Sequence, residues 1–330
     1  MNWQSDLAST LQSLTLRVLA LLAFALAAEA TLAAALAPGD YEFALTHQGL
    51  RRSYLVHMPP QAAQGKALPV VLNFHGGGSN AEVQKSYSRM DRSADRDGYI
   101  ALYPNGSAGI GNRFLTWNAG ACCGPAAALQ IDDVGFVQAI LDELPRRTPI
   151  DTGRIYATGL SNGSMMAYRV AAELSARIAA VAGVAGAMAI DRFAPSLSVP
   201  VMHVHSTGDH IARYDGGLGP PSTRLDTRNM NVPVEVALKK WIDHDGCPVR
   251  PATVEAVAGP PGTPDEAHSA IRRVYRPCRD GVEVVLWQLT GPGHVWPGGV
   301  RDYNPALLGT GTAVIDANSE MWRFFSRFKR

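Results

Sequence analysis

The chain has 330 residues, and its 30 basic and 29 acidic side chains leave a formal net charge of +1. With only 18% charged residues, this balance excludes both the basic surplus of a nucleic-acid-binding protein and a long acidic tail. The apolar fraction of 46% is ordinary for a globular protein. We therefore expect no nucleic-acid partner and no stable membrane partner.

The first feature along the chain is an apolar segment near the N-terminus. Arg17 precedes an apolar run at residues 18–28, and small residues with the A-x-A spacing follow at 35–37. This order is typical of a secretory signal peptide. It predicts a signal at residues 1–37, cleaved near Ala37 with Ala30 as a second candidate, and a secreted or periplasmic protein.

A membrane anchor or an amphipathic helix is the alternative interpretation of this segment. Glu29 interrupts the apolar residues, and the run before it is short for a bilayer span of ~20 residues. The remaining residues, 38–330, suit one large domain with an extensive core.

Strand-like and helix-like runs alternate through the rest of the chain. We expect strands at residues 41–47, 51–59, 68–74, 98–104, 154–159, 178–186, 199–206 and 281–289. We expect helices around residues 90–94 and at 132–147, 164–176, 234–244 and 317–328. Such alternation predicts an α/β fold with a mostly parallel, doubly wound sheet. In these sheets, ligands and chemistry gather at the carboxyl ends of the strands.

The sequence "GLSNG" places Ser161 between Gly159 and Gly163, where a predicted strand gives way to a helix. A G-x-S-x-G match alone is weak, because serine is also a preferred residue at a helix N-cap. The position between strand and helix is, however, the one that a nucleophile elbow requires. We therefore predict that Ser161 is a catalytic nucleophile.

A serine nucleophile needs donors for the oxyanion that forms during attack. The glycine-rich stretch "FHGGGSN" follows the apolar strand at residues 68–74 and can offer unobstructed backbone N–H groups. We predict an oxyanion hole made of Gly77, or a neighbour in this loop, and the backbone amide of Asn162. A plain tight turn is the alternative for this stretch.

A serine nucleophile also needs a base, which an acid must orient. Among the nine histidines, His294 stands in a glycine- and proline-rich loop directly after an apolar strand. Asp209 ends the stretch "VPVMHVHSTGD" at another strand exit. The chain order Ser161, Asp209, His294 is the order found in α/β-hydrolases.

Three other histidines receive supporting roles. His75 precedes the glycine-rich loop and is expected to brace it, whereas His203 and His205 alternate along one strand and are expected to pack beneath the site. A metal site made of His203, His205 and Asp209 is the alternative, but no further ligand pattern supports it.

Several motifs together resemble one esterase family: "FHGGG", "YPNG", "WNAGACCG", "DDVGF", "RIYATGLSNGSMMAY", "VHSTGD", "YDGG", "GHVWPGG" and "MWRFF". This family contains poly(3-hydroxybutyrate) depolymerase-like proteins and bacterial feruloyl and acetylxylan esterases. The resemblance implies a single-domain α/β-hydrolase fold and a secreted serine esterase without a cofactor. It also implies Ser161 as nucleophile, Asp209 as acid and His294 as base.

Two alternatives to an esterase remain open from the sequence. The same triad serves acyltransferases and peptidases, and a silent polymer-binding protein can share the scaffold. A polyhydroxyalkanoate-type polyester, a feruloylated or acetylated plant polysaccharide and a small aryl ester are all compatible with the site.

The aromatic side chains Tyr103, Trp117 and Trp296 follow predicted strands. Trp296 lies two residues from the proposed base, so we predict that it contacts the substrate, whereas packing is at least as good an interpretation for Tyr103 and Trp117. Asp132 and Asp133 are expected at a helix N-terminus, without a metal.

Four cysteines in an exported chain favour disulfides over a metal site. Cys247 and Cys278 bracket the loop "AGPPGTPDEA", and closing it would stabilise the fold by roughly 3–4 kcal/mol in a chain-entropy estimate. We predict this pair to be a disulfide. The adjacent Cys122 and Cys123 either bridge each other or stay reduced.

Overall fold

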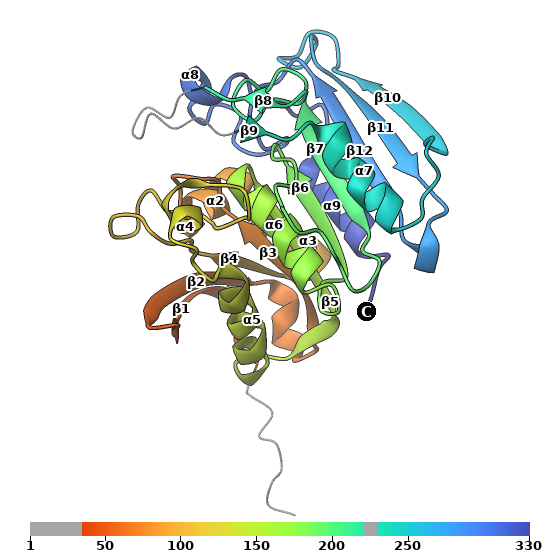
Figure 1. Ribbon diagram of the computed structural model, residues 1–330. Coiled ribbons are helices and arrows are strands. Elements are labelled where there is room, and N and C mark those ends of the chain that lie inside the picture. Colours follow the sequence, from red (N-terminus) through yellow and green to blue (C-terminus); the bar gives the residue numbers. More distant parts are fainter. Residues whose placement is uncertain (1–34, 221–229) are drawn as a thin grey trace, which may run out of the picture. The chain divides into compact units, whose positions relative to one another are not determined.

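A ten-stranded sheet organises the residues that the computed structural model describes, 35–220 and 230–330 (Figure 1). The strand order is β1-β2-β4-β3-β5-β6-β7-β12-β11-β10. In that order the strands are Gly39–His47, Leu50–Met58, Ile100–Pro104, Leu68–Phe74, Ile150–Leu160, Ala180–Val184, Val201–Ser206, Val284–Thr290, Ser269–Tyr275 and Thr253–Ala258.

The six strands from β4 to β12 in this order are parallel, and they form the centre of the sheet. An antiparallel pair, β1 and β2, extends one side, and β11 and β10 extend the other. The predicted mostly parallel sheet and its N-terminal antiparallel pair are therefore confirmed. The strands β10 and β11 were not expected from the sequence.

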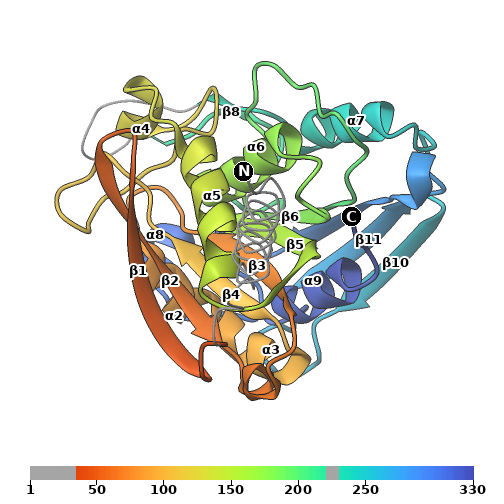
Figure 2. The same cartoon turned by 90° about the horizontal axis from the view of Figure 1, so that it is seen from below.

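Helices cover both faces of the sheet (Figure 2). One core cluster contains side chains of α5, α6 and α7, and a second contains side chains of α2, α3 and α9. These helices are Asp133–Glu143, Asn162–Glu173, Val234–His244, Ala81–Ser88, Met90–Asp97 and Ala317–Phe325. The strand β3 shows why two cores form: Val70 and Leu72 point into the first cluster and Val71 into the second, because successive side chains of a strand alternate between faces.

Shorter elements complete the described part. They are the helices α4 (Gly124–Ala128) and α8 (Pro305–Leu308), the 3-10 turns Pro60–Gln64, Leu144–Arg146 and Arg279–Gly281, and the two-residue strands β8 (Gly217–Leu218) and β9 (Met230–Asn231). Ala35–Arg330 form one compact unit, whereas most of the predicted signal peptide lies outside the described residues.

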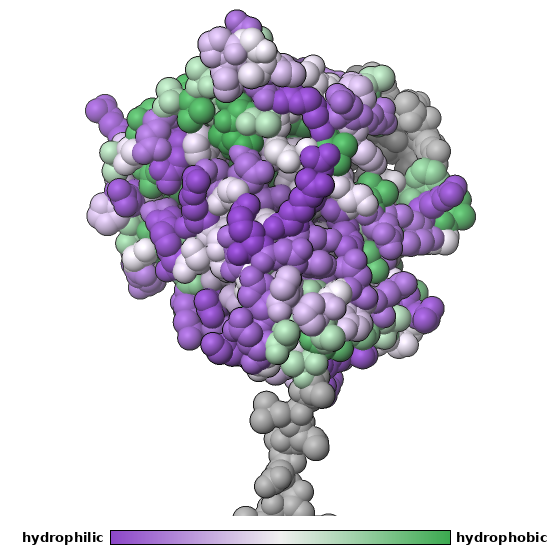
Figure 3. Space-filling view, turned by 180° about the vertical axis from the view of Figure 1, so that it is seen from behind, coloured by the Kyte–Doolittle hydropathy of each residue, from purple (hydrophilic) through white to green (hydrophobic). Residues whose placement is uncertain are grey.

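The surface opposite to the view of Figure 1 is mainly hydrophilic, with hydrophobic side chains in small scattered groups (Figure 3). None of the helices among the described residues is long and apolar enough to cross a membrane.

Candidate active site

Ser161 sits at a sharp turn between β5 and α6. Its backbone has φ 59° and ψ −122°, a conformation that costs a non-glycine residue about 1–3 kcal/mol and is kept where it has a use. Ser161 occupies the N-cap position of α6, but its side chain makes no capping hydrogen bond, so capping by the hydroxyl does not account for the serine. The turn is held by its main chain, since the Ser161 N–H donates to the Val184 carbonyl at 2.9 Å.

Two glycines make this turn sterically possible. A Cβ at Gly163 would collide with the carbonyl oxygen of Phe74, and a Cβ at Gly186 would collide with the backbone of Ser161 itself. Gly163 belongs to the "GLSNG" motif, whereas Gly186 follows β6 and carries no motif that marks it in the sequence. The segments that contain Phe74, Ser161 and Gly186 approach each other so closely that positions 163 and 186 accommodate only glycine.

Asp209 and His294 lie beside each other in the folded chain. Asp209 follows β7 by three residues and His294 follows β12 by four, and these two strands are parallel neighbours. The Nδ1 of His294 is 2.7 Å from Oδ2 of Asp209, and each residue is only 4% exposed. Because a carboxylate only accepts, His294 carries its proton on Nδ1, which leaves Nε2 free to act as a base.

The other oxygen of the Asp209 carboxylate is also occupied. Its Oδ1 accepts hydrogen bonds from the backbone N–H groups of Ile211 at 2.9 Å and Ala212 at 2.8 Å. Burial alone would raise the pKa of Asp209, but the attraction of His294 and the hydrogen bonds from His205 and His294 hold this pKa well below its usual range. Asp209 is therefore an ionised, oriented carboxylate.

The sheet brings Ser161 to the same edge as this pair. In the order β5-β6-β7-β12 the strands are parallel, so Ser161, Asp209 and His294 all follow carboxyl ends. Neighbouring strands are ~4.8 Å apart, so the three residues follow strands that lie within a short distance along this edge. In the described residues the Ser161 hydroxyl forms no hydrogen bond with His294. Such contacts are often long in unliganded enzymes.

The glycine-rich loop after β3 lies against the serine turn. A Cβ built on Gly76 would be 3.6 Å from the Cβ of Ser161, and one built on Gly77 would be 3.5 Å from the Cβ of Asn162. The glycine-rich loop therefore packs directly against Ser161 and the first residue of α6.

His75 holds the orientation of this loop. Its Nδ1 is 2.8 Å from the carbonyl oxygen of Gly76, and its Nε2 accepts a hydrogen bond from Gly106 at 2.9 Å. Complete burial lowers the pKa of His75 to about 4, so its ring is neutral. Because the peptide unit is planar and trans, fixing the Gly76 carbonyl also fixes the direction of the Gly77 N–H.

The side chain of Asn162 has a role that the sequence did not suggest. Its Oδ1 accepts from the Trp117 N–H at 2.8 Å, and its Nδ2 donates to the Trp117 carbonyl at 3.1 Å. The Trp117 indole in turn donates to the carbonyl of His75 at 3.0 Å. These bonds tie the loop around Trp117 to both the serine turn and the glycine-rich loop.

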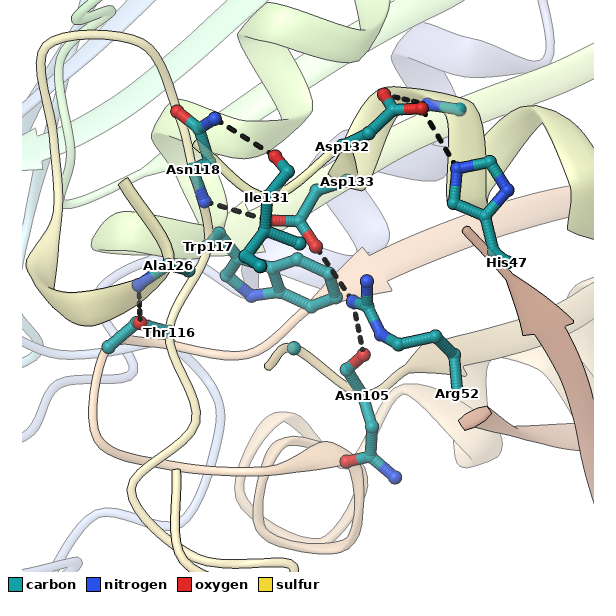
Figure 4. Close-up of polar contacts among 12 residues, drawn as sticks. His47, Arg52, Asn105, Thr116, Trp117, Asn118, Ala126, Ile131, Asp132 and Asp133 are labelled. Carbon is teal, nitrogen blue, oxygen red and sulfur yellow. Dashed lines mark hydrogen bonds and ion pairs between the residues drawn. The ribbon is translucent and has the colours of Figure 1, made fainter. Parts of the chain in front are cut away.

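A buried ion pair supports the loop from behind (Figure 4). Arg52 lies 2.7 Å from Oδ1 of Asp133, and the Asn118 N–H donates to Oδ2 of the same carboxylate at 2.8 Å. Burial raises the pKa of Asp133, although Arg52 acts in the opposite direction. Arg52 also donates to the carbonyl of Asn105 at 3.0 Å.

The neighbouring Asp132 has the expected position at a helix N-terminus. It accepts from the Gly135 N–H at 2.9 Å at the start of α5, and His47 lies 2.8 Å from its other oxygen (Figure 4). The helix N-terminal interpretation of Asp132 is therefore confirmed, and the carboxylate of Asp133 is committed to Arg52.

The three aromatic residues are buried. Tyr103 and Trp117 are 0% exposed, as packing residues are, and Trp296 is 1% exposed. The Trp296 indole donates to Asn318 at 3.1 Å and its backbone N–H donates to the Tyr87 hydroxyl at 3.0 Å. Its ring is enclosed by the second core rather than presented to a substrate, in contrast to the expectation, because the chain after His294 turns inward against α2 and α9.

Both cysteine pairs are joined. Cys247 and Cys278 form a disulfide, which links the end of α7 to the turn before β12. The adjacent Cys122 and Cys123 also form a disulfide, in the loop that follows Trp117. The Cys123 sulfur lies 3.8 Å from the sulfur of Met165 on α6.

The fold matches solved esterase structures. The acetyl xylan esterase from Aspergillus awamori superposes with a TM-score of 0.53 at 12% identity, covering 87% of this chain and 99% of that one. A thermostable esterase superposes with a TM-score of 0.51 at 15% identity, covering 88% and 63%. The fold is that of an α/β-hydrolase, with one domain around the central sheet.

Sequence relatives then define the family. Residues 52–222 match the family model "Esterase PHB depolymerase". The "Putative esterase NocK" of Nocardia uniformis subsp. tsuyamanensis is 30% identical over 79% of this chain and 75% of that protein. The chain belongs to the PHB depolymerase esterase family, and it is a carboxylic ester hydrolase.

Other relatives are larger than the region they share with this chain. "Feruloyl esterase B" of Piromyces equi is 29% identical over 74% of this chain, which spans only 42% of that protein. The "Bifunctional acetylxylan esterase/xylanase XynS20E" of Neocallimastix patriciarum is 27% identical over 75% of this chain, which spans 31% of it.

Proposed function

We propose that this esterase acts through a Ser161–His294–Asp209 triad and a covalent acyl-enzyme. One arrangement carries the proposal: a strained Ser161 and a hydrogen-bonded, buried Asp209–His294 pair stand at the same edge of the parallel sheet. Nucleophilic catalysis by a hydroxyl needs an imidazole base that an acid orients, and this edge of the sheet supplies both the serine and the oriented imidazole.

In the first step, His294 Nε2 removes the proton of the Ser161 hydroxyl as its oxygen attacks the ester carbonyl carbon. Asp209 keeps the proton on Nδ1 and stabilises the imidazolium that forms. The imidazolium then protonates the leaving alkoxide, and the alcohol departs. Water deprotonated by the same imidazole attacks the acyl-enzyme and releases the carboxylic acid.

The tetrahedral oxyanion would be held by the backbone N–H groups of Gly77 and Asn162. The Asn162 amide is one of the first in α6, so the positive end of the helix dipole adds to its effect. Losing one such donor typically costs about 10²–10³-fold in kcat. The contacts of His75 and of the Asn162 side chain support this role, because they keep both donor segments in place.

For the substrate, we propose feruloyl or acetyl esters of plant polysaccharides, or polyhydroxyalkanoate-type polyesters. The names of the relatives and of the family support these classes. We further propose export of the enzyme through a signal peptide at residues 1–37, as the pattern of the N-terminal sequence suggests.

The test compares purified enzyme with Ser161→Ala on methyl ferulate, acetylated xylan, a short nitrophenyl ester and dispersed polyhydroxybutyrate. Ser86→Ala, which changes an exposed serine of α2, is the matched control. We expect Ser161→Ala to lose turnover of every ester while its melting temperature stays near that of the parent.

A fluorophosphonate should label the parent and the Ser86→Ala variant at Ser161, and it should not label Ser161→Ala. Full activity of Ser161→Ala would refute the triad. Preferential transfer of the acyl group to an added alcohol or amine would replace hydrolysis with acyl transfer as the reaction.

A further inference from the structure

A buried chain of hydrogen bonds leads from Asp209 into the core. The Nε2 of His205 lies 3.2 Å from Oδ2 of Asp209, the same oxygen that His294 contacts. The Nδ1 of His205 lies 3.0 Å from Nε2 of His203. The Nδ1 of His203 lies 2.8 Å from the hydroxyl of Tyr168. These three side chains have no role in the triad.

The carbonyl oxygen of Ala212, which lies beside His205, decides which ring nitrogens in this chain of hydrogen bonds carry protons. His205 Nε2 is also 2.6 Å from the carbonyl oxygen of Ala212, which can only accept. That nitrogen therefore carries hydrogen, and in the neutral ring Nδ1 is an acceptor. His203 must then donate from Nε2 and accept at Nδ1, and Tyr168 supplies its O–H. The N–H of His205 therefore lies between two acceptors, the Ala212 carbonyl at 2.6 Å and Oδ2 of Asp209 at 3.2 Å. The Tyr168 hydroxyl also lies 3.3 Å from the carbonyl of Met202.

The side chains that form this chain of hydrogen bonds are buried. Tyr168, His203 and His205 are each 1% exposed. Burial places the pKa of His203 well below its ordinary value, so this ring stays neutral. A buried polar network whose members are all hydrogen-bonded is rigid, and a partly satisfied one is costly.

The chain of hydrogen bonds also links Asp209 with α6, the helix that follows Ser161. Tyr168 belongs to α6, seven residues or about two turns after Ser161. Its ring lies against the sheet where β6 has Gly183, at which a Cβ would lie 2.6 Å from a ring carbon of Tyr168. The acid of the triad is thus tied through the interior to the element that carries the serine.

Resting on the proposed triad, we propose that His205, backed by His203 and Tyr168, is a positioning residue that fixes the Asp209 carboxylate for His294. Oδ1 is held by two backbone amides, but Oδ2, which orients the imidazole, has only His205 as a second donor among the described residues. Without His205, Oδ2 keeps only its contact with His294, so the carboxylate is held less firmly on that side and the imidazole direction is less well fixed. A displacement of about 1 Å in a catalytic group can cost about 10²-fold in rate.

The test uses four variants of the full chain: His205→Leu, His205→Gln, Tyr168→Phe and the control Tyr156→Phe. Gln keeps an N–H donor near the position of Nε2, whereas Leu does not. Tyr156 also has a buried ring whose hydroxyl bonds a carbonyl, that of Phe328 at 2.9 Å, but it lies outside the chain.

We expect His205→Leu to lower kcat on a nitrophenyl ester about 10- to 100-fold with little change in KM. The acid limb of its kcat/KM profile should move to lower pH, because a less firmly held carboxylate stabilises the His294 imidazolium less. His205→Gln should recover most of kcat, Tyr168→Phe should lose about 2- to 10-fold, and Tyr156→Phe should match the parent.

Fluorophosphonate labelling gives the fraction of folded, reactive enzyme, so rates are compared per labelled Ser161. A His205→Leu variant with the parent's kcat and acid limb would overturn the inference. So would equal losses in the Leu and Gln variants with an unmoved limb, because these indicate packing alone. If the parent itself is not labelled at Ser161, the proposed triad has failed instead.

Discussion

Mild acid should weaken this protein through His75. The ring accepts a hydrogen bond from the Gly106 N–H, and protonation of Nε2 would set two donors against each other inside the core. Its pKa falls from 6.5 to about 4 on folding, so the folded chain binds this proton less readily than the unfolded one. The stabilisation is therefore complete above pH 6.5 and is lost as the pH falls towards 4.

The size of the stability loss follows from the difference between the ordinary pKa of His75 and its pKa in the folded chain. Each pH unit between the two pKa values is worth about 1.4 kcal/mol, so lowering the pH from about 7 to about 5 should remove about 2 kcal/mol of unfolding free energy through His75 alone. Urea unfolding at these two pH values measures this loss for the parent, for His75→Gln and for His210→Gln. His210 is an exposed histidine that also lies against a carbonyl oxygen, that of Leu307.

We expect the pH-dependent loss to shrink by about 2 kcal/mol in His75→Gln and to stay unchanged in His210→Gln. The kcat of the parent should decline over the same pH range, since the loop with Gly77 loses its brace. If His75→Gln lost as much stability as the parent over this pH range, the assignment of a neutral, buried His75 would be refuted.

Three further substitutions probe the support of the site. Asn162→Ala keeps the backbone amide but removes the clamp on Trp117, so kcat should fall about 10-fold or more while Ser161 remains labelled. Asp151→Ala, which removes contacts with Gly153 and Arg154 at the start of β5, the opposite end of that strand from Ser161, should not change kcat. Arg52→Leu leaves Asp133 buried and unpaired and should destabilise the fold by about 3–5 kcal/mol in urea unfolding; an equally stable variant would contradict this. Cys278→Ser should cost about 3–4 kcal/mol, and reductant should then no longer lower the stability of that variant to the same extent.

The sequence was sufficient for the centre of the fold because the central strands are continuous apolar runs. The strand β3, for example, is buried at all seven positions, and a short apolar run of this kind is typical of a parallel strand that is covered on both faces. The outer strand β10 escaped prediction because it lies at the edge of the sheet, where Val254 is 60% exposed and polar residues alternate irregularly. It pairs antiparallel with the next strand in sequence, β11, across the loop at residues 259–268.

The candidate site likewise contains residues that the sequence could predict and residues that it could not. Ser161, Asp209 and His294 could be named because each follows a recognisable strand in a polar, glycine-rich turn. The side-chain contacts of Asn162 and His205 could not, because their partners lie 45 and 4 residues away and become neighbours only through folding. Trp296 shows the opposite error: closeness to His294 in sequence suggested substrate contact, but the chain direction buries the ring.

Gly186 has a consequence for how this sequence can vary. It carries no side chain and lies about two dozen residues beyond Ser161 in the sequence, yet even a methyl group there would displace the serine's own backbone. Random mutagenesis followed by an ester-clearing screen would therefore select against change at position 186 as strictly as at the serine. Tolerance to substitution in this chain reflects backbone proximity as much as chemical function.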